Sequence, residues 1–135
     1  MKPKKHASSH RVLIVEDHAI LAEATAEFLQ NYGLEVRIAS TGNEAIEVAS
    51  AFLPEIVLCD MRLPDMGGAD VARALRALPG LENIVIAIHT AWEESQLRAT
   101  GVEMDAVDLI LSKPIDAKKL ETLLSVFRDQ IKRTA

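Results

Sequence analysis

The segment 56–68 constrains the fold of this chain more strongly than any other. Four apolar residues, Ile56 to Cys59, run directly into Asp60 and then into a turn rich in proline and glycine. An apolar run without alternation is typical of a strand buried on both faces, as in parallel sheets that helices cover. Asp60 is therefore expected at the carboxyl end of a strand, at the edge where open α/β sheets bind ligands.

Similar apolar runs recur along the chain and alternate with segments of helical periodicity. We expect strands at 11–15, 34–39, 56–59, 83–88 and 106–111, and helices at 18–32, 41–53, 69–78, 92–104 and 116–132. Thr41 with Glu44 fits a capping box, and Asp116 is expected to cap the last helix. The predicted apolar stripe of the first helix consists of Ile20, Leu21, Ala24 and Phe28.

Strands that alternate with helices in this way predict a doubly wound, three-layer α/β domain with five strands and five helices. We assume the flavodoxin-like strand order 2-1-3-4-5, in which the first and third strands are neighbours and the charged second strand is an edge. With this order, Glu16, Asp17 and Asp60 meet in one crevice. Thr90 and Lys113, which follow the fourth and fifth strands, are expected on its rim.

Length, charge and cysteine content narrow the class of protein. A chain of 135 residues can form one domain with its own core, and a net charge of -5 argues against direct nucleic-acid contact by this domain. Cys59 is the only cysteine and is expected to be buried and inert. No apolar run approaches the ~20 residues of a membrane span, so we expect no signal peptide and a cytoplasmic location. We expect a disordered basic lead at 1–10, the domain at 11–132 and a tail at 133–135.

The polar residues at the strand ends suggest phosphoryl chemistry. Three crowded carboxylates repel one another unless a cation lies between them, and Mg²⁺ is the usual ion where few protein ligands are available. Lys113 would add a positive charge and Thr90 a hydroxyl donor, which together suit the oxygens of a phosphoryl group. Asp60 is the candidate nucleophile, because a carboxylate needs no general base at pH 7.

These residues resemble the receiver domains of two-component response regulators. The resemblance covers about residues 11–132 and rests on Glu16-Asp17, the segment 60–68, Thr90-Ala91 and Lys113-Pro114, in this order. It implies that Asp60 accepts a phosphoryl group from a sensor histidine kinase or a phosphotransfer protein. The domain would then change its contacts with a downstream protein or effector domain. Such a domain is a phosphoacceptor that assists its own phosphorylation and dephosphorylation, and we do not expect an enzyme.

The resemblance also implies a role for each site residue. The Mg²⁺ ligands would be Glu16, Asp17, Asp60 and the backbone carbonyl of Arg62. The phosphoryl oxygens would be bound by Thr90, the amide of Ala91 and Lys113. The Lys113-Pro114 peptide is expected to be cis. A homodimer through the last two helices is a further expectation.

Three features depart from the family pattern. Ile110 occupies the position in the fifth strand where receivers commonly carry an aromatic residue that couples to Thr90, so we do not expect the usual aromatic switch. The segment 101–106 differs from the usual short turn, so the output face is expected to differ as well. Arg62 and Trp92 lie two residues beyond Asp60 and Thr90 and are candidates to screen the phosphoryl group from water. The alternative is that they are an ordinary surface charge and a packing aromatic.

Two other functions stay open from the sequence. A receiver-like interaction module that is never phosphorylated is slightly favoured by Ile110, but the site residues count against it. A phosphatase with an aspartate nucleophile is weaker, because such enzymes usually carry a second acid two residues later on the first strand, whereas Ala19 follows Asp17 at that spacing. A stand-alone receiver and a part of a longer regulator or hybrid kinase are equally compatible with the sequence.

Overall fold

The computed structural model describes residues 10–134, so the expected basic lead, except His10, and Ala135 lie outside the described residues. In the described part, five parallel strands form one sheet with the order β2-β1-β3-β4-β5, which confirms the predicted architecture. Along the chain the elements are β1 (Arg11–Val15), α1 (Ala19–Gln30), β2 (Glu35–Ala39), α2 (Gly42–Phe52), β3 (Ile56–Cys59), α3 (Gly68–Arg76), β4 (Val85–Thr90), α4 (Glu94–Ala99), β5 (Leu109–Ser112) and α5 (Ala117–Thr134).

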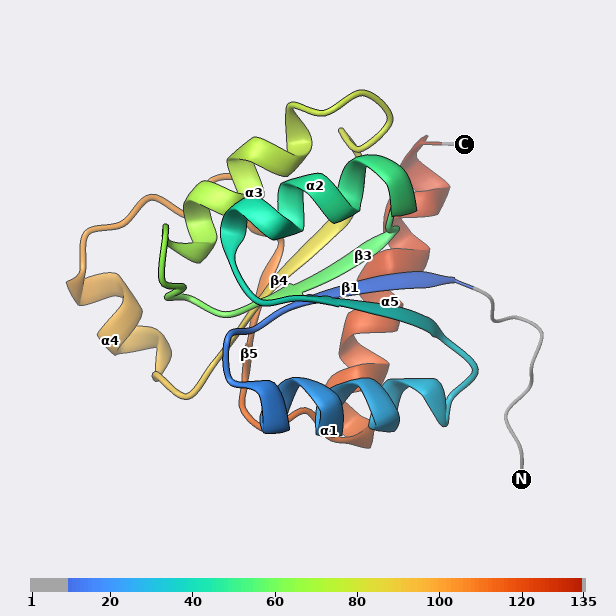
Figure 1. Cartoon of the computed structure of the whole chain (residues 1–135), viewed down its shortest axis with the longest axis horizontal. Helices are drawn as coiled ribbons and strands as arrows, with labels where there is room; N and C mark the ends of the chain where they lie inside the picture. Colours follow the sequence, from blue (N-terminus) through green and yellow to red (C-terminus); the bar gives the residue numbers. More distant parts are fainter. Residues whose placement is uncertain (1–9, 135) are drawn as a thin grey trace.

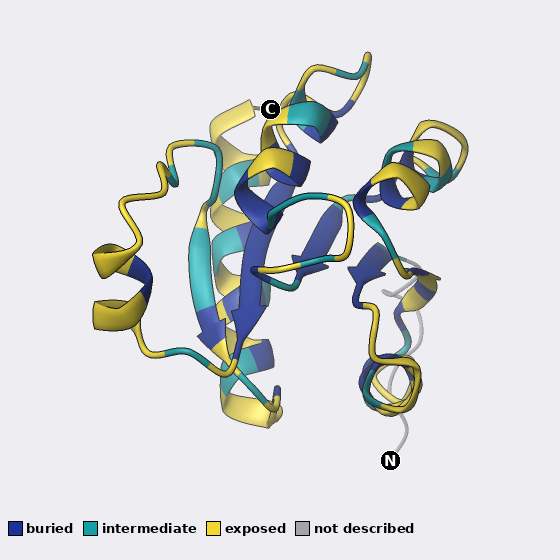
Figure 2. Cartoon of the chain, turned by 60° about the vertical axis from the view of Figure 1, so that its left-hand side comes forward, coloured by how far each residue is buried: buried dark blue, intermediate teal, exposed yellow. Residues whose placement is uncertain are grey.

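Helices cover both faces of the sheet (Figure 1). α1 and α5 pack on one face, whereas α2, α3 and the single buried side chain of α4 pack on the other. Successive residues of β1 alternate between these two cores, with Val12 and Ile14 on the first face and Leu13 and Val15 on the second. Burial of each such side chain stabilises the fold by about 1.5–3 kcal/mol, so the central strands are its most strongly held part. Figure 2 shows the central strands as mostly buried, and every residue of β3 and β4 is buried.

The strand order reverses at β1, which has β2 on one side and β3 on the other. Val15 is the register partner of both Ala39 and Cys59, so β1 and β3 end at the same level. The backbone N–H of Asp60 continues this pairing and donates to the carbonyl of Val15 at 2.9 Å. The topology therefore places the residues after β1 beside the residue after β3.

β4 has the expected length but lies two residues later in the chain than the sequence pattern indicates. It begins at Val85 and continues to Thr90, although we expected it to end at residue 88. His89 and Thr90 are buried, and they pair with Leu111 and Ser112 of β5. The polar character of these two side chains hides their place in the strand, because a buried strand is normally recognised by its apolar residues.

β5 begins at Leu109 and not at residue 106, because an arginine holds the preceding segment. Arg76, the last residue of α3, donates to the carbonyl of Ala106 at 2.9 Å and to the carboxylate of Asp108 at 2.7 Å. The same carboxylate accepts the backbone N–H of Ile86 at 2.8 Å. These contacts satisfy groups that strand pairing would otherwise use, so the strand starts only after Asp108.

α4 and α1 also differ from the expectations. α4 covers only Glu94–Ala99 of the expected 92–104, because Gly101 with φ +74° ends the helical path. In α1 the expected stripe is wrong at two of its four residues, since Ile20 is 76% exposed and Ala24 is exposed as well, whereas Leu21 is partly buried and Phe28 packs against the first core. The face toward the sheet consists of Ala22, Thr25, Ala26 and Leu29, which have the same helical spacing shifted around the axis. Small residues on this face made it inconspicuous in the sequence.

The predicted N-cap residues of two helices are confirmed, although Thr41 and Glu44 do not form the expected capping box, because Glu44 accepts the N–H of Ser40 at 2.8 Å instead of that of Thr41. Thr41 accepts the N–H of Glu44 at 3.0 Å, and Asp116 accepts the N–H of Lys119 at 2.9 Å. α5 continues to Thr134, two residues beyond the expected end at 132. Within the described residues, none of the helices has the length and apolar character that a membrane span requires.

Candidate functional site

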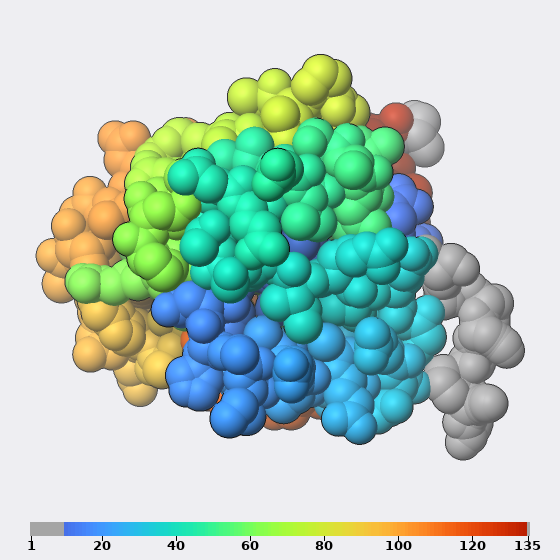
Figure 3. Space-filling view, viewed as in Figure 1, coloured from blue at the N-terminus to red at the C-terminus, as the bar shows by residue number. Residues whose placement is uncertain are grey.

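Three carboxylates gather where β1 and β3 end. Glu16 and Asp17 follow β1, Asp60 follows β3, and one oxygen of each lies within 4.8 Å of the others. Glu16 is buried, Asp60 is partly buried and Asp17 is exposed, so the group opens to solvent on one side. In the space-filling view, the residues after β1 (blue), the loop after β3 (green) and α4 (yellow-orange) come together on the left-hand side (Figure 3). The structure thus brings together the three acids that the sequence singled out.

Lys113 lies against two of these acids. Its Nζ donates to Oε1 of Glu16 at 2.7 Å and to Oδ2 of Asp60 at 3.2 Å. Burial alone would lower the pKa of the ammonium, but the hydrogen bond to Glu16 and the charges of Asp60 and Glu16 outweigh it and raise that pKa above 10.5. The peptide between Lys113 and Pro114 is cis, as expected. Lys113 is therefore a fixed positive charge on the inner side of the acid cluster.

Thr90 ends β4 at the same edge of the sheet. It is 2% exposed, and its Oγ1 accepts the backbone N–H of Trp92 at 3.1 Å. The backbone N–H of Lys113 donates to the carbonyl of Thr90 at 2.8 Å, which ties the end of β5 to the end of β4. Ala91, whose amide is a candidate donor, is exposed directly after it. A hydroxyl and an ammonium are thus held on neighbouring strands beside the carboxylates.

The loop after Asp60 needs glycine at one position. A Cβ on Gly68 would lie 2.3 Å from the carbonyl oxygen of Asp60 and 2.9 Å from Cδ1 of Ile88. By contrast, a Cβ on Gly67 would meet no atom closer than 3.6 Å. The N–H of Gly68 donates to the carbonyl of Met61 at 2.7 Å, which closes the loop. The close approach of α3 to the backbone of Asp60 therefore depends on Gly68.

Asp65 is a structural residue of the site that the sequence analysis missed. Its two carboxylate oxygens accept the N–H groups of Gly42 and Asn43, each at 2.8 Å. The hydrogen bonds from Asn43 and Gly42 lower the pKa of this carboxyl below its ordinary value. A negative charge at the N-terminus of α2 also suits the helix dipole. Asp65 therefore fastens the loop after β3 to α2, a contact that local sequence spacing does not reveal.

Arg62 and Trp92 are in direct contact. Cζ of Arg62 lies 4.8 Å from the centroid of the Trp92 ring, within the range of a cation–π interaction. Arg62 is exposed and Trp92 is partly buried. The sequence placed each two residues beyond a site residue but gave no sign that the two side chains meet. Together they form a bridge between the loop after β3 and the loop after β4.

Two buried groups near the acids have shifted pKa values. Burial, followed by the charge of Lys113, lowers the pKa of His89 to about 4, so its imidazole is neutral at pH 7. Its Nε2 has no hydrogen-bond partner among residues 10–134. Burial, with the charges of Asp60 and Glu16, raises the pKa of Cys59 well above 9.0, and this thiol is buried as predicted. A neutral imidazole and an unionised thiol leave Lys113 as the cation facing these acids.

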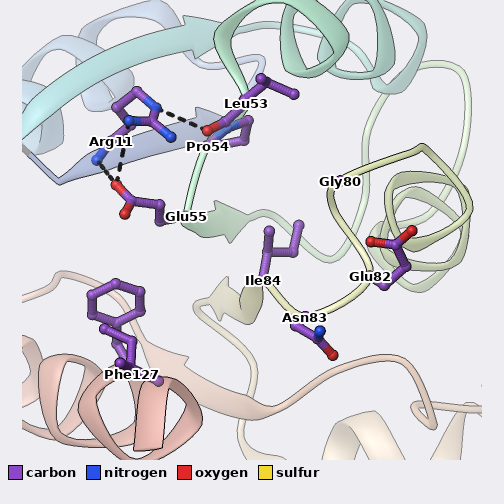
Figure 4. A pocket seen from close by; sticks show the side chains of 10 residues that line it. Arg11, Leu53, Pro54, Glu55, Gly80, Glu82, Asn83, Ile84 and Phe127 are labelled. Atoms are coloured by element: carbon purple, nitrogen blue, oxygen red, sulfur yellow. Dashed lines mark hydrogen bonds and ion pairs between the residues drawn. The ribbon is translucent and has the colours of Figure 1, made fainter. Parts of the chain in front are cut away.

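A hollow of about 340 Å³ lies elsewhere on the molecule (Figure 4). Its lining includes Arg11, Glu55 and Ile84, which lie at or just before the amino ends of β1, β3 and β4. The acid cluster follows the carboxyl ends of β1 and β3. This hollow is therefore at the other end of the sheet and takes no part in the chemistry of the acids.

Comparisons with known proteins agree with this geometry. Residues 12–125 match the family model described as the response regulator receiver domain. The DNA-binding response regulator MtrA of Mycolicibacterium paratuberculosis is 34% identical over 110 residues, which are 82% of this chain and 47% of that protein. A response regulator receiver protein of Anaeromyxobacter is 37% identical over 111 residues, which are 82% of this chain and 45% of that protein. The chain thus spans about half the length of these relatives.

Solved structures show the same fold. A CheY-like receiver domain protein from Methanospirillum hungatei has a TM-score of 0.78 and 26% sequence identity, over 93% of this chain and 99% of that chain. A CheY-like receiver domain from Methylobacillus flagellatus has a TM-score of 0.76 and 28% sequence identity, over 89% of this chain and 99% of that chain. The similarity extends over nearly the whole of both solved domains.

Proposed function

Because the chain belongs to the response regulator receiver domain family, we propose that Asp60 accepts a phosphoryl group from the phosphohistidine of a kinase or phosphotransfer protein. The reaction would require Mg²⁺, and its product would change the contacts of this domain with a downstream protein or effector domain. The observation that carries the proposal is the position of Lys113, whose ammonium is bonded to both Asp60 and Glu16 beside a third acid. The domain would act as a phosphoacceptor and not as a turnover enzyme.

The residues present fit a Mg²⁺ ion. Three carboxylates within 4.8 Å of one another face a single ammonium among residues 10–134, so their negative charge is only partly balanced there. Oxygen ligands of this kind are those that Mg²⁺ prefers. Glu16, Asp17, Asp60 and the backbone carbonyl of Arg62 would hold the ion, which when bound neutralises charge on the phosphoryl oxygens.

The transfer step needs only positioning and charge stabilisation by this chain. A carboxylate oxygen of Asp60 attacks the phosphorus atom, the P–N bond to the histidine breaks, and its electron pair returns to the imidazole. Lys113 would move its hydrogen bond from Asp60 to a phosphoryl oxygen. The hydroxyl of Thr90 and the amide of Ala91 would donate to the other oxygens. The product is an acyl phosphate on Asp60.

The direct test is intact mass after incubation with Mg²⁺ and acetyl phosphate. We expect one phosphoryl group on the wild-type protein and none on the matched variant Asp60→Asn, which keeps the shape of the side chain but removes its nucleophilic charge. Chelation of Mg²⁺ with EDTA should abolish the adduct. Absence of the adduct on the wild-type protein under conditions in which Mg²⁺ binds would contradict the proposal.

One observation favours an alternative, a receiver-like module that works without phosphorylation. Ile110 stands where an aromatic residue commonly couples the site to the output face, and it lies among the residues packed against the second core. The same mass measurement separates the two functions, because the alternative predicts no adduct while partner binding persists in Asp60→Asn.

A further inference from the structure

The stacked pair Arg62–Trp92 connects the site to α4. The guanidinium of Arg62 is exposed and forms no ion pair or side-chain hydrogen bond within residues 10–134, so the Trp92 ring is the contact that holds it. On the other side, the backbone N–H of Trp92 donates to Oγ1 of Thr90 at 3.1 Å. Trp92 is thus held through its ring by Arg62 and through its backbone by Thr90, in addition to its packing against the second core.

Both holding groups belong to residues of the proposed phosphoryl site. Arg62 is two residues from Asp60, and Thr90 is a proposed phosphoryl-binding residue. An ion pair between a guanidinium and a phosphoryl group is stronger than an exposed cation–π contact, because both partners are charged and the hydrogen bonds can be bidentate. A new dianion on Asp60 would therefore compete for two of the groups that hold Trp92.

α4 begins two residues after Trp92 and is weakly fixed by its own packing. Leu97 is its one buried residue, whereas α3 has five. A hollow of about 360 Å³ separates part of α4 from β5, and its lining includes Leu97, Met104 and Ile110. In Figures 1 and 2, α4 stands away from the sheet and from the other helices. Its position therefore depends strongly on the loop that Trp92 anchors.

We propose that Arg62 and Trp92 form a phosphorylation-sensitive latch that takes the place of the aromatic switch missing at Ile110. Without a phosphoryl group, Arg62 stacks on Trp92 and the loop before α4 is held. When Asp60 carries the group, Arg62 leaves the ring to pair with the phosphoryl oxygens and Thr90 turns toward them, so Trp92 and α4 are released. This inference rests on the proposed function of Asp60 and adds the route by which its phosphorylation reaches the surface.

The chain provides its own probe, because Trp92 is its single tryptophan. Intrinsic fluorescence would be recorded before and after incubation with Mg²⁺ and acetyl phosphate, and intact mass would be measured on the same samples. We expect the emission of the wild-type protein to change as the adduct forms. Arg62→Met removes the charge but keeps the length of the side chain and the backbone carbonyl. Before phosphorylation, the emission of the Arg62→Met variant should already resemble that of the phosphorylated wild-type protein. Phosphorylation of the variant should then change its emission only slightly.

The matched control is Arg37→Met, because Cζ of Arg37 lies 5.0 Å from the Phe52 ring and forms a comparable pair away from the site. This variant should keep the full wild-type response. Hydrogen exchange of the α4 amides gives a second readout, which should rise on phosphorylation of the wild-type protein and be high in Arg62→Met from the start.

Each contrary result has a distinct meaning. If the adduct forms while Trp92 emission and α4 exchange stay constant, or if Arg62→Met responds like the wild-type protein, the latch is wrong and the phosphoacceptor function stands. If intact mass shows no adduct on the wild-type protein, the proposed function fails and the latch fails with it.

Discussion

Lys113 donates a shorter hydrogen bond to Glu16, at 2.7 Å, than to the proposed phosphoacceptor, at 3.2 Å. The lysine is thus held mainly by a buried acid that does not react, and it can release Asp60 without losing its place. Glu16 in turn depends on Lys113, since it is 5% exposed and a lone buried carboxylate would be costly.

Lys113→Met should therefore destabilise the protein in the absence of divalent cations. We expect the free energy of unfolding in EDTA to fall by about 3 kcal/mol, the usual cost of breaking a buried ion pair from one side. Mg²⁺ should bind several-fold more tightly to the variant, because the ammonium no longer competes for the carboxylates. Urea titration and calorimetric titration measure the two effects. Lys118→Met on α5 is the control, and weaker Mg²⁺ binding by Lys113→Met would contradict this account.

Gly68→Ala should be far more damaging than Gly67→Ala. The added methyl group would overlap the carbonyl oxygen of Asp60 at 2.3 Å in the first case and meet nothing closer than 3.6 Å in the second. We expect a loss of at least about 2 kcal/mol of stability for Gly68→Ala, together with slower phosphorylation by acetyl phosphate. The Gly67→Ala variant should stay close to the wild-type protein in both measurements. Equal behaviour of the two variants would show that the loop relaxes freely.

His89 should make the protein less stable in acid. Its pKa is about 4 in the folded protein and about 6.5 in the unfolded chain, so between these values only the unfolded chain binds the proton. The contribution of neutral His89 to the free energy of unfolding is therefore fully present above pH 6.5 and is lost as the pH decreases toward 4. At pH 4.5 the loss should be about 2–3 kcal/mol. Urea unfolding at pH 7 and pH 4.5 measures this loss.

The control for this experiment separates His89 from the other titrating groups. His89→Leu should lose this part of the pH dependence, whereas His18→Gln, at an exposed position, should retain it. If the wild-type protein and His89→Leu have the same pH profile, the imidazole does not titrate as described.

Removal of the Arg62 and Trp92 side chains should shorten the life of the phosphoryl group. In the proposed phosphorylated state the guanidinium of Arg62 pairs with the phosphoryl oxygens, and the Trp92 ring, which contacts Arg62 in the unphosphorylated protein, lies in the neighbouring loop, so both side chains can hinder the approach of water to Asp60. We expect the double variant Arg62→Ala/Trp92→Ala to dephosphorylate several-fold faster after removal of the donor. Arg98→Ala on α4 is the control. An unchanged lifetime would mean that the pair does not screen the site.

Ile20 should affect the rate of phosphorylation by a protein donor but not by a small-molecule donor. This side chain is 76% exposed in the first turn of α1, close in sequence to Glu16 and Asp17, where the proposed phosphohistidine partner would approach. Ile20→Ser should slow phosphotransfer from a histidine kinase and leave the rate with acetyl phosphate unchanged. Ile131→Ser, also exposed but on α5, is the control. Equal slowing with both donors would place the effect in the site itself.

The sequence predicted the five strands well, because most of them are strongly apolar runs. The acid cluster followed from them once the strand order 2-1-3-4-5 was assumed, and the structure confirms that order. Prediction from the sequence failed where long-range polar contacts determine where a strand begins or how a loop is held. The start of β5 depends on Arg76, which is 30 residues away from Ala106, and the loop after β3 depends on an Asp65 contact that spans 23 residues. The buried face of α1 was missed because alanine and threonine carry little hydrophobic signal. Arg62 and Trp92 were noticed by position, but their contact exists only in the folded chain.

The Asp65 contact with the first turn of α2 makes one side of the site more rigid than the other. On the first side, the loop after β3 is attached to a helix by two hydrogen bonds at 2.8 Å. On the opposite side, the loop before α4 leads to a helix with a single buried anchor. A force that arises between the two sides will therefore displace the second and spare the first, so the fold itself gives the signal a direction.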